Sequence, residues 1–168
     1  MMRRVFLAAV WMPVWAACGE PPPRLPDLPN PSEYWVERSD VELATAVKEA
    51  CLRATRRDKN LLLAFSAPWC IDCRQMRALE KQPELVTELA HWEQVVVDVG
   101  RLDRHQALLD HFRVRAIAHW VALDPTACAL DATQWPVLRA STFEPRTGWF
   151  SLKTAPELQE WLVAARGG

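Results

Sequence analysis

Apolar and polar residues are arranged along the chain in patterns that predict a series of helices and strands. Residues 40–57 carry apolar side chains at helical spacing, with Ser39 or Asp40 available as the N-terminal cap, which predicts an amphipathic helix. Residues 61–65 form a short, continuous apolar run, and residues 95–99 form a second run that only Asp98 interrupts; such runs are typical of strands buried on both faces of a sheet. The first hundred residues therefore combine helices with central strands.

The segment between those two runs, residues 71–91, predicts a helix that Pro83 kinks or restarts, because proline cannot donate a helical hydrogen bond. Residues 126–147 are difficult to interpret, and we treat them as an inserted loop. The other predicted elements are a helix over 102–112, a strand over 116–123, a strand within 137–150 and a helix over 155–165. This order predicts an α/β sandwich.

The first residues differ from the rest of the chain. Arg3 and Arg4 precede an apolar run over residues 5–15, which is too short to span a bilayer and is typical of an export signal. The run closes on Trp-Ala-Ala-Cys, which resembles the lipobox of bacterial lipoproteins, so we expect a signal peptide over residues 1–17 and a lipid anchor on Cys18. The alternative is an ordinary secretory signal, which would leave Cys18 as a thiol.

A proline-rich spacer is predicted over residues 18–33, because six prolines lie between Glu20 and Ser32 and favour the extended polyproline II conformation. Its expected role is to hold the domain of residues 34–168 away from the membrane, and a disordered tail without a role is the alternative. The net charge of −1 becomes 18 − 21 = −3 without residues 1–17. We therefore expect no nucleic-acid partner, and membrane attachment through the acyl anchor.

The cysteine pair Cys70 and Cys73 follows a predicted buried strand and opens a predicted helix. A sulfur in the first turn of a helix faces unpaired backbone N–H groups and the positive end of the helix dipole, which favours the thiolate. We therefore interpret Cys70 as the nucleophile. Cys73 lies one turn further on, where it can attack the mixed disulfide that Cys70 forms with a substrate.

Zinc binding is the alternative use of a CxxC pair, but it needs two more ligands at metal spacing, and the sequence has no second CxxC and no HxxxH. We expect no cofactor. Two other cysteines remain: Cys51 belongs to the apolar face of the first helix, and Cys128 lies in the loop. Cys128 is either a free thiol or the disulfide partner of Cys51.

The stretch from Leu62 to Met76, which contains Ala-Pro-Trp-Cys-Ile-Asp-Cys, resembles the active-site segment of thioredoxin-like proteins. It is most similar to exported bacterial members such as the C-terminal domain of the transmembrane disulfide-exchange reductase. The resemblance extends over about residues 40–165. It implies a three-layer sandwich with a mixed central sheet flanked by helices, and protein disulfides or dithiols as substrates. It also places Trp69, Ile71 and Asp72 around the two cysteines.

Two positions depart from the pattern of that family. Many members have a buried carboxylate, the proton acceptor for the resolving cysteine, where this chain has Ala64. The family also has a cis-proline facing the cysteine pair, and here that place holds Ala118. Because a cis bond before a residue other than proline costs about 3 to 4 kcal/mol, we predict a trans Ile117–Ala118 peptide unless packing forces the cis form. His119 is next in the sequence, and with Cys70 and Cys73 it could bind a soft metal such as Cu(I).

Three functions are compatible with this sequence. The first is an envelope thiol:disulfide oxidoreductase that faces the periplasm, exchanges with an unidentified electron donor and acts as a reductase, since Asp72 disfavours a thiolate beside it. The second is a metal-binding or metallochaperone module that uses Cys70, Cys73 and His119. The third is a binding module that keeps the fold without turnover.

Overall fold

The computed structural model describes residues 31–125, 128, 131–143 and 154–167. The signal peptide, Cys18 and the spacer up to residue 30 lie outside the described residues. No helix in the described part of the chain is long and apolar enough to cross a membrane.

Four strands form one mixed sheet in the order β2-β1-β3-β4. Their bounds are β1 Asn60–Ser66, β2 Trp92–Asp98, β3 His119–Leu123 and β4 Val137–Thr142. β1 is parallel to β2 and antiparallel to β3, and β4 is antiparallel to β3. β1 is central, and all its residues after Asn60 are buried, as its continuous apolar run predicts.

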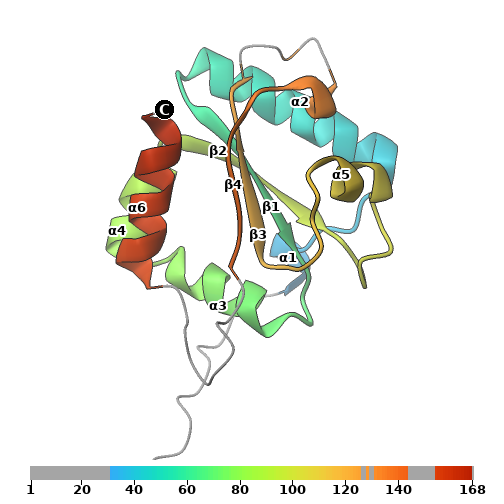
Figure 1. The fold of residues 1–168 in the computed structure, drawn as a ribbon, viewed down its shortest axis with the longest axis horizontal. Helices are drawn as coiled ribbons and strands as arrows, with labels where there is room; N and C mark the ends of the chain where they lie inside the picture. The colour runs from blue at the N-terminus through green and yellow to red at the C-terminus, as the bar shows by residue number, and fades with distance from the viewer. Residues whose placement is uncertain (1–30, 126–127, 129–130, 144–153, 168) are drawn as a thin grey trace, which may run out of the picture.

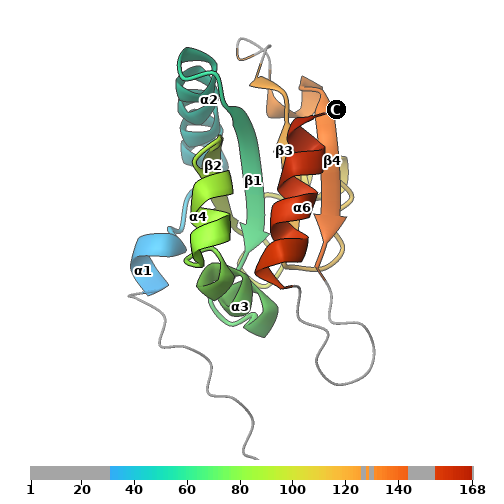
Figure 2. The ribbon, with the colours of Figure 1, turned by 90° about the vertical axis from the view of Figure 1, so that its left-hand side faces the viewer.

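Helices cover both faces of this sheet, which makes three layers (Figure 1). α4 and α6 lie on one face, and α2 and α5 lie on the other, while α3 follows the end of β1 (Figures 1 and 2). Their bounds are α1 Pro31–Tyr34, α2 Asp40–Arg56, α3 Ile71–Leu79, α4 Pro83–Leu89, α5 Gln106–His111 and α6 Ala155–Arg166, with a 3-10 turn, η2, at Ala132–Gln134. The predicted α/β sandwich is confirmed.

Local sequence signals explain where several helices begin. Ser39 caps α2 in a capping box, in which its side chain accepts from the Glu42 N–H while the Glu42 carboxylate accepts from the Ser39 N–H. Thr154 caps α6 in the same way. Pro83 separates α3 from α4 and occupies the first turn of α4, as its missing N–H predicts.

Several predicted bounds are wrong. The helix expected over 102–112 is only α5, because Leu102 and His105 have positive φ angles of 65° and 57°, which a right-handed helix excludes. β2 starts at Trp92 rather than at residue 95, and β3 starts at His119 rather than at residue 116. The loop expected over 126–147 also contains η2, whereas the strand expected within 137–150 is confirmed as the edge strand β4, whose side chains are mostly solvent-accessible.

Candidate active site

Cys70 is the N-cap residue of α3, where β1 and the turn that follows it end. The backbone N–H of Cys73 points at the Cys70 sulfur at 3.2 Å. The two cysteines form a disulfide, with their Cα atoms 5.2 Å apart. Once this bond is reduced, the N–H group and the helix dipole favour a thiolate on Cys70, as the position of the pair in the sequence predicts.

The two cysteines differ in exposure from the residues next to them. Cys70 is 6% exposed and Cys73 only 2%, whereas Trp69 is 54% and Ile71 60% exposed. A partner therefore meets two large apolar side chains around a nearly buried sulfur pair, and it reaches Cys70 more easily than Cys73.

The Ile117–Ala118 peptide lies opposite the cysteine pair and is cis, so the prediction of a trans bond is wrong. The Ile117 carbonyl oxygen lies 3.7 Å from the Cys70 sulfur, and the Ala118 carbonyl accepts a 2.8 Å hydrogen bond from the Phe143 N–H. The intrinsic preference of the dipeptide favours trans, and the prediction allowed for a cis bond only where packing forces it. The groups that contact the two carbonyls, the Cys70 sulfur and the Phe143 N–H, come from distant segments of the chain and cannot be predicted from the dipeptide alone.

Asp72 supplies a carboxylate within the CxxC pair, whereas Ala64 supplies none in β1. Ala64 is buried in β1 opposite Val96 and Trp120, so this position has no proton acceptor. Asp72 lies between the two cysteines in the first turn of α3, and partial burial raises the pKa of its carboxyl above the usual value. The raised pKa reflects partial desolvation of this carboxylate.

His119 begins β3 and is buried. Its Nδ1 lies 2.6 Å from the Thr142 hydroxyl, its Nε2 is buried without a partner, and burial lowers its pKa to about 4. Within the residues that the structure describes, no three histidine, cysteine, aspartate or glutamate side chains form a group that could hold a metal ion. The structure therefore does not assemble Cys70, Cys73 and His119 into the metal site of the second hypothesis.

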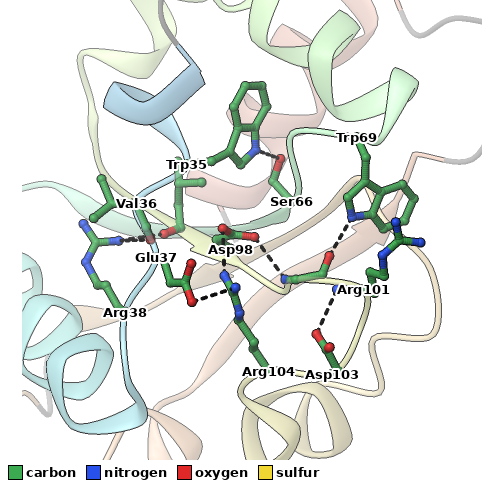
Figure 3. Close-up of polar contacts among 12 residues, drawn as sticks. Trp35, Val36, Glu37, Arg38, Ser66, Trp69, Asp98, Arg101, Asp103 and Arg104 are labelled. Carbon is green, nitrogen blue, oxygen red and sulfur yellow. Dashed lines mark hydrogen bonds and ion pairs between the residues drawn. The ribbon is translucent and has the colours of Figure 1, made fainter.

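A loop after β2 forms the next wall of the site, and sequence reasoning did not find it. The Trp69 indole N–H donates to the Gly100 carbonyl at 2.7 Å, which turns the ring toward this loop (Figure 3). Behind it, the Arg104 guanidinium pairs with the buried Asp98 at 3.1 Å and with Glu37 at 2.7 Å. A hollow of about 510 Å³ lies between these groups, and its lining includes Trp35, Pro68 and Trp69.

The segment before α2, which we call the N-terminal strap (residues 31–38), is bound to the same end of the domain. The Trp35 indole donates to the Ser66 hydroxyl at 2.7 Å, and the Tyr34 hydroxyl donates to the Glu80 carboxylate at 3.1 Å. Burial, followed by the charge of Glu80, raises the Tyr34 pKa well above its usual value. The predicted domain starts at residue 34 and so already includes Tyr34 and Trp35, whereas α1 begins three residues earlier, at Pro31.

A second disulfide joins Cys51 in α2 to Cys128 after β3, with 5.7 Å between their Cα atoms. Of the two alternatives left open by the sequence, the structure shows the paired one. Cys51 is fully buried, and the Pro125 carbonyl oxygen lies 3.0 Å from the Cys128 sulfur. This buried bridge is separate from the exposed surroundings of Cys70.

The order of the strands, the cysteine pair at the start of α3 and the cis peptide opposite it together identify the architecture. The chain has the thioredoxin fold. A disulphide isomerase from Xylella fastidiosa Temecula1 has the same fold, with a TM-score of 0.57 and 22% identity over 76% of this chain and 94% of that one. The thioredoxin-like resemblance of the sequence is thus confirmed at the level of the fold.

Two further solved structures are similar. A thioredoxin from Thermus thermophilus has a TM-score of 0.52 and 22% identity, over 71% of this chain and 85% of its own. The DsbD C-terminal domain from Neisseria meningitidis, in its reduced form, has a TM-score of 0.50 and 22% identity, over 71% of this chain and 93% of its own. No family model and no curated protein sequence matches the chain.

Proposed function

We propose that this thioredoxin-fold protein is a thiol:disulfide oxidoreductase of the bacterial cell envelope that exchanges disulfides with other proteins through Cys70 and Cys73. The observation that carries the proposal is the Cys70 sulfur at the N-cap of α3, with the Cys73 N–H directed at it. This arrangement favours the nucleophilic form of Cys70 and keeps the resolving thiol within reach.

Reduction of a substrate takes two exchanges. The Cys70 thiolate attacks one sulfur of the substrate disulfide, forms a mixed disulfide and releases the other substrate sulfur as a thiolate. Cys73, after it loses its proton, attacks the Cys70 sulfur and displaces the second substrate thiolate. The substrate gains two electrons, and the Cys70–Cys73 disulfide remains until a dithiol donor reduces it. With Ala64 in place of a carboxylate in β1, solvent at the exposed Trp69 and Ile71 is our candidate acceptor for the Cys73 proton.

The direction of exchange that we propose is reduction. Asp72 carries a partly buried carboxylate within the CxxC pair. A negative charge beside Cys70 disfavours its thiolate and so destabilises the reduced state, which lowers the reduction potential. This makes the pair a better electron donor than an oxidant.

The proposed location is the periplasm-facing side of a membrane, through the signal peptide of residues 1–17 and an acyl anchor on Cys18. The support for it is the sequence: small residues before Cys18, and a proline-rich spacer after it. Metabolic labelling with a radioactive fatty acid tests the anchor. We expect label on the wild-type chain and none on Cys18→Ser, and an unlabelled wild-type chain would contradict it.

The activity is tested by reduction of insulin disulfides with dithiothreitol as donor. We expect turnover by the wild-type protein, and loss of turnover in Cys70→Ser and Cys73→Ser. The matched control is the double variant Cys51→Ala and Cys128→Ala, which removes the buried disulfide and should keep the activity. Equal rates for wild type and Cys70→Ser would contradict the proposal and favour a binding module without turnover.

A further inference from the structure

The N-terminal strap enters the folded domain at the same end as the cysteine pair. The Trp35 side chain is hydrogen-bonded to Ser66, the last residue of β1, and Trp35 lines the same hollow as Trp69. Tyr34 contacts the Arg77 guanidinium of α3, which lies 4.2 Å from the centre of the tyrosine ring. Figure 2 shows α1 beside α3, at the end of the domain toward which β1 points. The chain that precedes residue 31 therefore joins the domain next to the active site.

The other end of the chain joins the domain far from the cysteines. Arg166, at the end of α6, lines a hollow with Asn60, the first residue of β1. It also pairs with Glu88 of α4 at 3.2 Å. The seven residues of β1 separate this end from the strap, a span of about 20 Å at the usual rise of a strand. Both views show the end of α6 opposite α3 (Figures 1 and 2).

The spacer limits how far the active site can lie from an anchor on Cys18. Twelve residues separate Cys18 from Pro31, and five of them are prolines. At about 3.1 Å per residue, a polyproline II chain of that length spans about 37 Å. This distance is comparable with the size of a small folded domain.

From this geometry we infer that the cysteine pair faces the membrane and exchanges with disulfides of membrane-bound proteins that stand within about 40 Å of the bilayer surface. The inference rests on the proposed disulfide exchange and on the proposed anchor at Cys18. The strap attaches the spacer to the active-site end of the domain, so a disulfide on a membrane-bound protein is present at a high effective concentration. A disulfide on a freely diffusing protein gains nothing from this attachment.

The chemistry is the two-step exchange described above, with the disulfide of the membrane-bound partner as oxidant. The partner disulfide accepts two electrons and becomes a dithiol. Cys70 and Cys73 become a disulfide, and a dithiol donor restores them.

The test compares two attachment points on the same vesicles. Both proteins start at residue 18 with Cys18→Ser, so neither can be acylated. One carries a hexahistidine tag at its N-terminus, and the matched control carries it after Gly168. Vesicles contain a nickel-chelating lipid and a polyethylene glycol lipid that ends in a pyridyl disulfide. The readout is the release of pyridine-2-thione by the reduced protein, with the same pyridyl disulfide free in solution as reference.

We expect the N-terminally attached protein to react with the lipid-borne disulfide about tenfold faster than the C-terminally attached one, because only its active site faces the surface. Both should react equally with the free disulfide. Equal rates on the vesicles would overturn the orientation while leaving the exchange activity intact. A rate with free disulfide that does not depend on Cys70, tested with Cys70→Ser, would overturn both proposals.

Discussion

Removing the buried disulfide between Cys51 and Cys128 should cost the protein a large share of its stability without affecting exchange. The two residues are 77 positions apart in the sequence. In the chain-entropy relation, a cross-link that closes a loop of this size destabilises the unfolded state by about 4.5 kcal/mol. For the three-residue separation of Cys70 and Cys73, the same relation gives about 1.6 kcal/mol.

Urea unfolding under oxidising conditions measures this effect. It compares the wild type with Cys51→Ala, Cys128→Ala and the double variant. We expect each single variant to lose about 3 to 4.5 kcal/mol of unfolding free energy, and the double variant to lose about the same amount rather than twice as much. Either substitution alone already breaks the bond, which is why the losses should not add. The active-site variant Cys70→Ser is the control, with a much smaller loss.

A loss below about 1 kcal/mol in both single variants would refute the reasoning, because a closed loop of 77 residues cannot then be constraining the unfolded chain. If the losses of unfolding free energy in the two single variants added up in the double variant, that would also refute the reasoning. Each substitution would then be acting through its own buried side chain rather than through one shared bond.

Three further predictions concern single side chains. The pKa of His119 is lowered to about 4 in the folded protein against 6.5 in the unfolded chain, so the unfolded state binds more protons between these values. The free energy of unfolding should therefore be highest above pH 6.5 and fall by up to about 3 kcal/mol as the pH drops toward 4. A His119→Gln variant with the same pH dependence in urea unfolding would contradict this prediction. Trp35→Phe should lose about 1 to 2 kcal/mol in urea unfolding, because it leaves the buried Ser66 hydroxyl without its donor, and Trp35→Phe with unchanged stability would show that the strap is not held there. Asp72→Asn should raise the reduction potential of the pair by on the order of 10 to 20 mV in glutathione buffers, because it removes a negative charge beside the Cys70 thiolate. An unchanged or lowered potential would count against the role given to Asp72.

The elements that could be predicted are those whose signal is local. Ser39 and Glu42 form a capping box that can be read directly from the sequence, and α2 begins where they place it. The buried part of β1 after Asn60 appears as a continuous apolar run, and Pro83 ends the predicted helix and begins α4. For the candidate site, Cys70 and Cys73 were identified because a CxxC pair between a buried strand and a helix is itself a local pattern.

The features that the sequence could not reveal depend on contacts between distant segments. The cis peptide at Ala118 is contacted by Cys70 and Phe143, which lie far from it in sequence. The Cys51–Cys128 pairing needs both α2 and the end of β3 in place. Glu37 and Arg104 meet only because the strap packs against the loop after β2. None of these leaves a periodic pattern in the chain.

The same distinction explains the bounds that were wrong. β2 begins with Trp92, Glu93 and Gln94, where buried and half-buried side chains replace a continuous apolar run. The segment before α5 contains helix-forming residues, yet Leu102 adopts a positive φ in a turn in which its N–H donates to the Val99 carbonyl at 2.8 Å. Tertiary placement of that turn outweighs local helix preference.

Disulfide exchange at Cys70 and Cys73 is tested most directly by redox titration of the purified protein in glutathione buffers, with alkylation and mass spectrometry to locate the free thiols. We predict one two-electron transition confined to Cys70 and Cys73, with a midpoint more negative than about −200 mV, while the Cys51–Cys128 disulfide stays intact. Cys70→Ser should abolish the transition. A midpoint near −120 mV would contradict the reducing role, and the absence of any transition at Cys70 and Cys73 would contradict disulfide exchange itself.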